Sequence, residues 1–257
     1  MPGMIREYDV PVPMRDGVNL TVDIYRPDAP GKYPVLYACA MHNKDLQRVE
    51  VAENLKVGQP AWSTQWYGII EAGDSKRLVA NGYVHVIGQV RGGHKSEGEV
   101  GVNDEWDEYD TFEWICAQPW CDGAVGMIGI SYFAMAQLEA AVEKPPHLKA
   151  IFPVAVTPDL YDAAYHHGLL NASFDAPFMS AMGVTSGRSD AFWRGKLLAA
   201  VRHILTEPPI HARLAHMNGE AAVTGLKKVM RLHYDAVPWD ELFTQIAIEH
   251  QVRDAFW

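Results

Sequence analysis

Four short apolar runs, separated by helical patterns, constrain the fold of this chain more than any other feature. The runs are KYPVLYACA (32–40), GYVHVIGQV (82–90), AVGMIG (124–129) and LKAIFPVAV (148–156). The helical patterns between them cover residues 72–81, 104–118 and 131–143. Because buried strands that alternate with helices are typical of α/β folds, the sequence predicts a mostly parallel sheet with helices on both faces.

The two ends of the chain differ from this central pattern. Residues 4–13 and 18–27 are predicted to form two strands around the turn MRDG, as a hairpin at one edge of the sheet. Residues 159–257 contain helical patterns broken by prolines and no alternating strand pattern. We therefore predict a sheet domain over residues 1–158 and a helical cap over residues 159–257.

Charge and composition narrow the class of partner. The formal net charge of −10 over 257 residues disfavours a general binder of nucleic acid or anionic membranes, since such proteins need a basic face. The sequence has neither a signal-peptide core nor an apolar stretch approaching ~18 residues. Three widely spaced cysteines favour reduced thiols. We expect a cytoplasmic protein that acts on a small molecule, without nucleic acid or membrane partners; its oligomeric state, including a homo-oligomer, is left open.

Ser131 lies between the apolar run at 124–129 and the helical pattern that follows. At such a turn the serine hydroxyl is exposed above the sheet, and the first N–H groups of the helix point at the group it attacks. The turn needs small neighbours. Gly129 supplies one two positions before Ser131, but Phe133 stands two positions after it. The pattern G-x-S-x-G is half present, and by itself it fits a helix-start serine as well as a nucleophile.

Three motifs in order add to this pattern: PVLYACAMHNKD (34–45), VRGGHKSEGE (90–99) and QPWCDGAVGMIGISY (118–132). Together they resemble the cocaine esterase / X-prolyl dipeptidyl-peptidase / α-amino-acid ester hydrolase family of α/β-hydrolases, from about Asp9 to about Tyr165. The resemblance implies an α/β-hydrolase core under a helical cap. It also implies a cofactor-free serine hydrolase that cleaves a small-molecule ester or amide through an acyl-enzyme on Ser131, with the backbone N–H of Tyr132 as one oxyanion donor.

The residues after the first apolar run depart from that family's pattern. The family has a Pro-Tyr pair there, commonly followed by lysine, and the tyrosine hydroxyl is the second oxyanion donor. This chain has Met41 and His42, then Asn43 and Lys44. An imidazole N–H of His42 can replace that hydroxyl, and a side-chain donor at such a site contributes roughly 10²–10³ in rate. The alternative is a loop histidine with a solvated ring.

Two other loops carry weaker signals. Trp62, Trp66 and Tyr67 follow the His42 region and either line the substrate pocket or form a buried aromatic brace. The glycine-rich loop at 90–99 lacks the spacing of a phosphate-binding loop. In the resembled family the corresponding loop braces the active-site region, and this resemblance implies that Arg91 makes buried hydrogen bonds with a structural role.

A serine nucleophile needs a histidine base and an orienting carboxylate, which follow the serine in α/β-hydrolases. In the resembled family both come after later strands, and no strand pattern follows residue 156 here. We expect the chain to be truncated before the last strands of the sheet, with the triad acid and base beyond residue 257 and no activity in this segment alone. The alternative, Asp159 or Asp162 as acid with His166 or His167 as base, is geometrically awkward because these residues are so close in sequence.

Two further hypotheses concern function without this chemistry. No metal site is predicted, because neither H-E-x-x-H nor C-x-x-C occurs among the histidines and cysteines. The half-formed serine motif and His42 also fit a non-catalytic α/β-hydrolase-fold module that binds or scaffolds.

Overall fold

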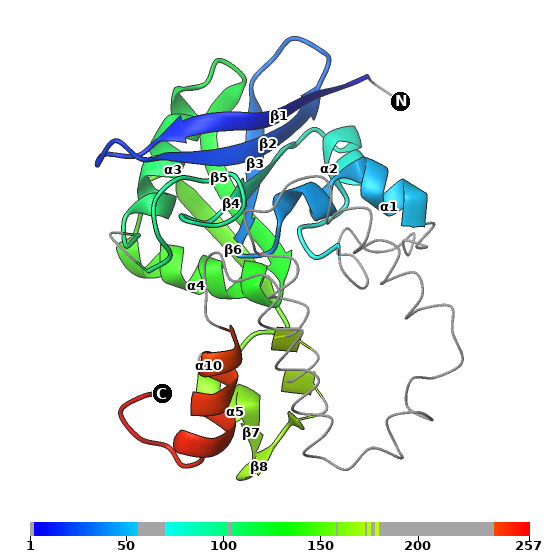
Figure 1. The fold of residues 1–257 in the computed structure, drawn as a ribbon. Helices are drawn as coiled ribbons and strands as arrows, with labels where there is room; N and C mark the ends of the chain where they lie inside the picture. Colours follow the sequence, from blue (N-terminus) through cyan, green and yellow to red (C-terminus); the bar gives the residue numbers. More distant parts are fainter. Residues whose placement is uncertain are drawn as a thin grey trace. The chain divides into compact units, whose positions relative to one another are not determined.

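The computed structural model describes residues 3–55, 70–101, 104–157, 159–172, 174–175, 178–179 and 239–257. The chain divides into two compact units, Met1–Pro158 and Asp159–Trp257 (Figure 1). The interpretation of the second unit as a helical cap stays a prediction, because residues 180–238 lie outside the described part of the chain.

The first unit is built on a six-stranded sheet with the order β1-β2-β4-β3-β5-β6. The strands are β1 (Met4–Pro13), β2 (Asn19–Pro27), β3 (Tyr33–Ala40), β4 (Val84–Gln89), β5 (Cys121–Ile130) and β6 (Leu148–Val154). β1, β2 and β4 pair antiparallel, whereas β4, β3, β5 and β6 pair parallel. The predicted edge hairpin and the mostly parallel sheet are confirmed.

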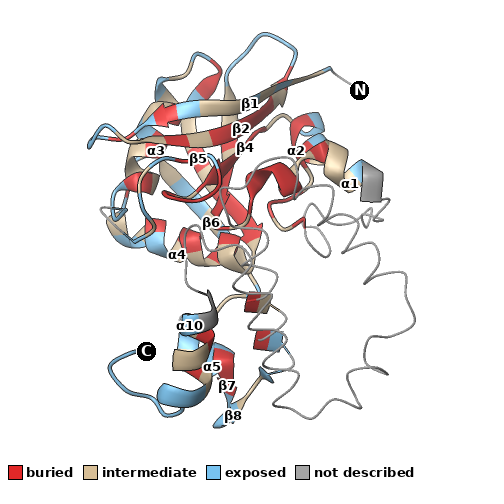
Figure 2. Cartoon of the chain, viewed as in Figure 1, coloured by how far each residue is buried: buried red, intermediate tan, exposed pale blue. Residues whose placement is uncertain are grey.

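Helices cover both faces of this sheet, as predicted. α2 is Ser75–Ala80, α3 is Asp107–Ala117 and α4 is Tyr132–Glu143. α3 and α4 contribute Phe112, Ile115 and Ala136 to one apolar cluster, while α2 contributes Leu78 and Val79 to a second. Buried residues accordingly follow the strands and the inner sides of these helices (Figure 2).

A short helical segment after β3 was not predicted. It consists of η1 (Lys44–Gln47) and α1 (Val49–Leu55). All four residues of η1 are buried although three of them are polar or charged. The segment lacks the apolar periodicity that reveals a helix in sequence, so contacts with distant residues must account for its position.

The described part of the second unit has four short elements and one helical turn. These are α5 (Leu160–Ala164), β7 (Tyr165–His166), β8 (Leu169–Leu170), α10 (Trp239–Thr244) and a π-helical turn η3 (Gln245–Glu249). β7 and β8 pair as a short hairpin, and strands of two residues are too short to show alternation in the sequence. No described helix has the length and apolar character needed to cross a membrane.

Candidate functional site

Ser131 occupies the tight turn between β5 and α4. Its φ and ψ are 60° and −122°, a left-handed region that is strained for a residue with a Cβ. The N–H of Ser131 donates to the carbonyl of Val154 over 3.0 Å, and its own carbonyl accepts from the N–H groups of Ala134 and Met135. The Ser131 side chain makes no capping hydrogen bond to the helix. An ordinary helix-start serine would use its hydroxyl in that way.

The structure explains why the first position of the pattern is a glycine when position 133 carries a side chain. Gly129 has φ of +145°, and a Cβ added there would lie 2.3 Å from the Cβ of Phe133. The side chain of Phe133 is completely buried. Gly129 therefore allows the close approach between its own backbone and the Cβ of Phe133 at this turn.

The ring of His42 packs beside this turn. It stacks on Phe133 with ring centroids 5.8 Å apart and lies edge-on to Tyr132 at 6.4 Å. The side chain is only 16% exposed. The alternative of a solvated loop histidine is therefore wrong, while a role of His42 as oxyanion donor stays a prediction.

Glu71 is the neighbour of His42 that sequence reasoning missed. Its Oε2 atom lies 3.3 Å from Nε2 of His42. The backbone carbonyl of Glu71 accepts from the N–H of Ile130, the residue before the serine, over 3.1 Å. The amide oxygen of Gln47 accepts from the N–H of Glu71 over 2.7 Å. No motif marks Glu71 in the sequence, because its partners come from three separate segments.

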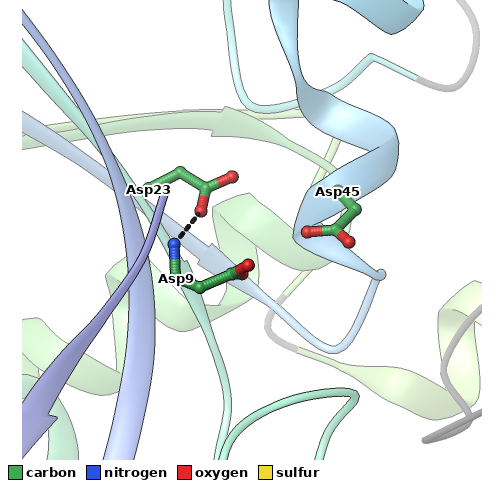
Figure 3. Close-up of side chains that lie close together, drawn as sticks. All are labelled: Asp9, Asp23 and Asp45. Carbon is green, nitrogen blue, oxygen red and sulfur yellow. Dashed lines mark hydrogen bonds between the residues drawn. The ribbon is translucent and has the colours of Figure 1, made fainter. Parts of the chain in front are cut away.

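A buried ion-pair network holds the segment that follows His42. Nζ of Lys44 contacts Asp9, lies 2.7 Å from Asp23 and 3.3 Å from Asp45, and its side chain is fully buried. Figure 3 shows the three carboxylates around one space, where the backbone N–H of Asp9 also donates to Asp23. Nε of Arg48 lies 2.6 Å from Asp23.

The carboxylates of this network come within 4.8 Å of one another, a spacing that a cation could bridge. The ammonium of Lys44 and the guanidinium of Arg48 already supply that positive charge. Burial alone would raise the pKa of Asp45, but a hydrogen bond with His94 and the charges of Lys44 and Arg48 hold it far below its usual range. The network fastens η1 to β1 and β2, and it thereby positions the preceding His42.

Arg91 has the structural role that was expected of it. It is buried and donates through Nε and Nη2 to the two oxygens of Asp107 over 3.0 and 2.7 Å, while Nη1 donates to Asp16 over 2.7 Å. A paired, bidentate guanidinium of this kind fixes the geometry of its partners. The contact with Asp107 ties the glycine-rich loop to the start of α3.

A cavity of about 420 Å³ opens next to the turn and is lined by the Tyr132 side chain. Its wall is acidic, with Asp104, Glu108 and Glu139 among the lining residues. Burial and repulsion from neighbouring carboxylates raise the pKa of Glu108 to about 8. Near pH 7 the carboxyl group of Glu108 is therefore mostly protonated.

The aromatic residues predicted to line a substrate pocket or form a buried brace lie outside the described part of the chain. They are Trp62, Trp66 and Tyr67.

The alternative triad residues belong to the second unit. The carboxylate of Asp159 pairs with Nη1 of Arg253, and that of Asp162 lies 3.0 Å from Nη2 of the same side chain. His166 and His167 are exposed. The two carboxylates therefore share a salt bridge at the surface, an arrangement that serves to hold α5 to the C-terminal segment.

Comparison with known proteins gives consistent matches. The family model of X-Pro dipeptidyl-peptidase (S15 family) matches residues 16–257. Cocaine esterase of Rhodococcus sp. (strain MB1 Bresler) is 42% identical over 189 residues, which cover 71% of this chain and 30% of that protein. A CocE/NonD family hydrolase from Staphylococcus aureus is similar in structure, with a TM-score of 0.58, 25% identity, and coverage of 99% of this chain and 38% of that one.

An α-amino acid ester hydrolase shares the fold with a TM-score of 0.63 at 21% identity, over 99% of this chain and 39% of that one. The chain thus spans about a third of the length of these relatives. The matches confirm the resemblance and the α/β-hydrolase fold that the three motifs predict.

Proposed function

Because the chain belongs to the X-Pro dipeptidyl-peptidase (S15) family of serine hydrolases, we propose that Ser131 is the nucleophile of an enzyme that cleaves an ester or amide bond. The observation that carries the proposal is the conformation of Ser131 between β5 and α4. It combines a strained, positive φ with a hydroxyl that does not cap the helix. Strain of about 1–3 kcal/mol at such a residue persists where the surrounding structure holds the side chain for use.

The proposed reaction has two steps. Oγ of Ser131 attacks the substrate carbonyl carbon as a base removes the hydroxyl proton, and the developing oxyanion accepts hydrogen bonds from the Tyr132 N–H and the His42 imidazole. The tetrahedral intermediate collapses as the alcohol or amine leaves with a proton. Water then attacks the acyl-enzyme and restores the serine hydroxyl.

The proposal places the triad acid and the histidine base beyond residue 257. The chain covers 30% of the cocaine esterase that it resembles, which is consistent with further catalytic residues in a longer protein. That relative also supports a small-molecule ester as the substrate class. The three cysteines are free thiols, which supports the reducing, cytoplasmic setting that we propose.

A fluorophosphonate probe tests the nucleophile directly in the full-length protein. We expect covalent labelling of the wild type, loss of the label in Ser131→Ala, and retention in the control Ser96→Ala, whose buried hydroxyl donates to the carbonyl of Gln89 instead. Labelling of Ser131→Ala at wild-type intensity would contradict the proposal. A full-length protein that is folded but takes no label would favour the non-catalytic binding module.

The position of the base is tested separately on the 257-residue chain. If the base lies outside it, this chain shows no measurable turnover of activated esters. Ser131-dependent hydrolysis by the chain alone would show that a base is present within it.

A further inference from the structure

The backbone of Glu71 takes over the role of a neighbouring strand at the end of β5. β3 pairs with β5 up to Met127, whereas the pairing of β6 with β5 continues to Ile130. At Ile130, the residue before Ser131, the backbone N–H donates to the carbonyl of Glu71 over 3.1 Å. The strand that carries the serine is therefore held on both sides up to its last residue.

Glu71 and the residue after it belong to neither a helix nor a strand, although Ala72 is fully buried. Backbone polar groups that are buried outside regular structure need other partners. The carbonyl of Glu71 has the N–H of Ile130. The other three backbone groups of this residue pair are bound by the side chains of Gln47 and His85.

Gln47 binds both backbone N–H groups. Its side chain accepts from the N–H of Glu71 over 2.7 Å and from the N–H of Ala72 over 3.1 Å. Because both partners are donors, the shared atom must be the amide oxygen. Gln47 is only 3% exposed and lies at the end of η1, the segment that the Lys44 network fastens to β1 and β2. The acceptor therefore has a fixed position.

His85 of β4 binds the carbonyl of Ala72. Nε2 of His85 lies 3.1 Å from that carbonyl oxygen, and Nδ1 lies 2.8 Å from the hydroxyl of Ser75. A carbonyl only accepts, so Nε2 carries the hydrogen and Nδ1 accepts from the hydroxyl. Burial lowers the pKa of His85 to about 4, and the ring is therefore neutral near pH 7, as this arrangement requires.

The strained conformation of Ser131 depends on such support. A positive φ at a residue with a Cβ persists only where the surrounding structure determines the backbone from several sides. The N–H of Ser131 is bound by the carbonyl of Val154 in β6, and the preceding N–H is bound by the carbonyl of Glu71. A displacement of Glu71 removes one of these two constraints.

We propose that Gln47 and His85 are positioning residues for the nucleophile, an inference that rests on the proposed function. Their side chains hold the backbone of residues 71 and 72, so that the carbonyl of Glu71 fixes Ile130 and, with it, the turn at Ser131. Both act through the backbone and exchange no proton in the reaction. A misplacement of about 1 Å at a reacting group can cost about 100-fold in rate, so remote contacts of this kind can control the reactivity of a hydroxyl.

The decisive variant is Gln47→Met in the full-length protein, because methionine keeps the length of the side chain and removes the accepting oxygen. The first measurement is amide hydrogen exchange by NMR on ¹⁵N-isoleucine-labelled protein, with Ile130→Val to assign the signal. The reference is Ile128 in the same strand. We expect the ratio of the Ile130 rate to the Ile128 rate to rise by about tenfold, since local opening frees Ile130 alone. A general loss of stability would raise both rates together.

The second measurement is the rate constant for labelling of Ser131 by the fluorophosphonate probe. We expect Gln47→Met to lower it by about 10–100-fold. Gln47→Glu, which keeps an accepting oxygen at the same reach, should recover part of the rate and part of the exchange ratio. The control is Gln118→Met, which removes a hydrogen bond to the carbonyl of Trp114 at the end of α3 and should change neither readout.

A second variant reaches the same contact from the other side chain. His85→Phe leaves Gln47 in place and keeps a ring at position 85, but it removes the donor to the carbonyl of Ala72. It should change the exchange ratio and the labelling rate in the same directions as Gln47→Met. If Gln47→Met does not fold, His85→Phe is judged by the same criteria.

The two readouts separate the possible failures. An unchanged exchange ratio in Gln47→Met overturns the positioning role. A raised ratio with labelling at the wild-type rate shows that the held backbone does not control the serine, and it overturns the proposal as well. A wild type that takes no label contradicts the nucleophile itself, and the exchange ratio then shows separately whether Gln47 holds Ile130 through Glu71.

Discussion

Substituting Gly129 with alanine tests how the serine turn is built. The φ of +145° is unfavourable for any residue with a Cβ, and strain of this kind costs about 1–3 kcal/mol. The new methyl group would also lie 2.3 Å from the Cβ of Phe133, an atom that can move only with its backbone. Overpacking of that kind costs about 1–3 kcal/mol. The expected loss of about 2–6 kcal/mol is a large part of the ~5–15 kcal/mol that stabilises a typical domain.

Urea unfolding followed by circular dichroism measures this loss. The matched control is Gly126→Ala in the same strand, where the added Cβ meets the end of the Leu36 side chain, 3.1 Å from Cδ2. That side chain can rotate away and the backbone at Gly126 needs no positive φ. We therefore expect the control to change the free energy of unfolding by less than about 1 kcal/mol.

Changing Phe133 separates the two contributions at Gly129. Phe133→Ala keeps the Cβ that causes the close contact, whereas Phe133→Gly removes it. Gly129→Ala should therefore cost about 1–3 kcal/mol more in the alanine background than in the glycine background. Equal costs in both backgrounds would refute the reasoning that Phe133 is what requires a glycine at position 129.

Three further outcomes follow from contacts away from the turn. Lys44→Met should lower the free energy of unfolding by about 3–5 kcal/mol in the same urea assay, because it leaves buried carboxylates without their central cation; a loss below about 1 kcal/mol would contradict this. Burial raises the pKa of Asp45 in the folded protein, but the hydrogen bond with His94 and the nearby cations outweigh it and lower this pKa. The Asp45 carboxylate therefore contributes its full stabilisation above the pKa of about 3.9 that it has in the unfolded chain. This stabilisation is lost as the pH falls toward the lower pKa of the folded protein. Acid titration of stability should show this loss, and Asp45→Asn should reduce the slope. Oxidised glutathione should form a disulfide between Cys116 and Cys121, because their Sγ atoms are 3.8 Å apart. Mass spectrometry should show the loss of two hydrogens, and dithiothreitol should reverse it. A stable glutathione adduct on either residue would contradict that pairing.

The sequence predicted the sheet because its strands are apolar enough to be recognised one by one. The run at 32–40 is the most continuously apolar near the N-terminus, and it forms β3 with a strand on each side. The segment after it was missed because its order comes from charge. Lys44 is buried only because carboxylates on β1 and β2 surround it, and no local pattern reports such partners.

The candidate site was predictable to a similar extent. Ser131 stands out through its place between a strand and a helix, and the neighbouring motifs add His42. The close contact between Gly129 and Phe133 depends on the three-dimensional geometry of the turn, and the position of Glu71 beside His42 depends on a distance between separate segments of the chain. The half-matched serine motif could therefore be recognised from sequence. The contacts of Phe133 with Gly129 and of Glu71 with His42 could not.

The contacts among His42, Glu71 and Phe133 bear on how such a site changes during evolution and in protein engineering. Replacing His42 with tyrosine by a single mutation would leave the Glu71 carboxylate without its partner and change the ring that rests on Phe133. On the proposed role of His42 as an oxyanion donor, an exchange between histidine and tyrosine therefore passes through a less stable protein unless several positions change at once. The three residues are best transplanted, or inherited, as one unit.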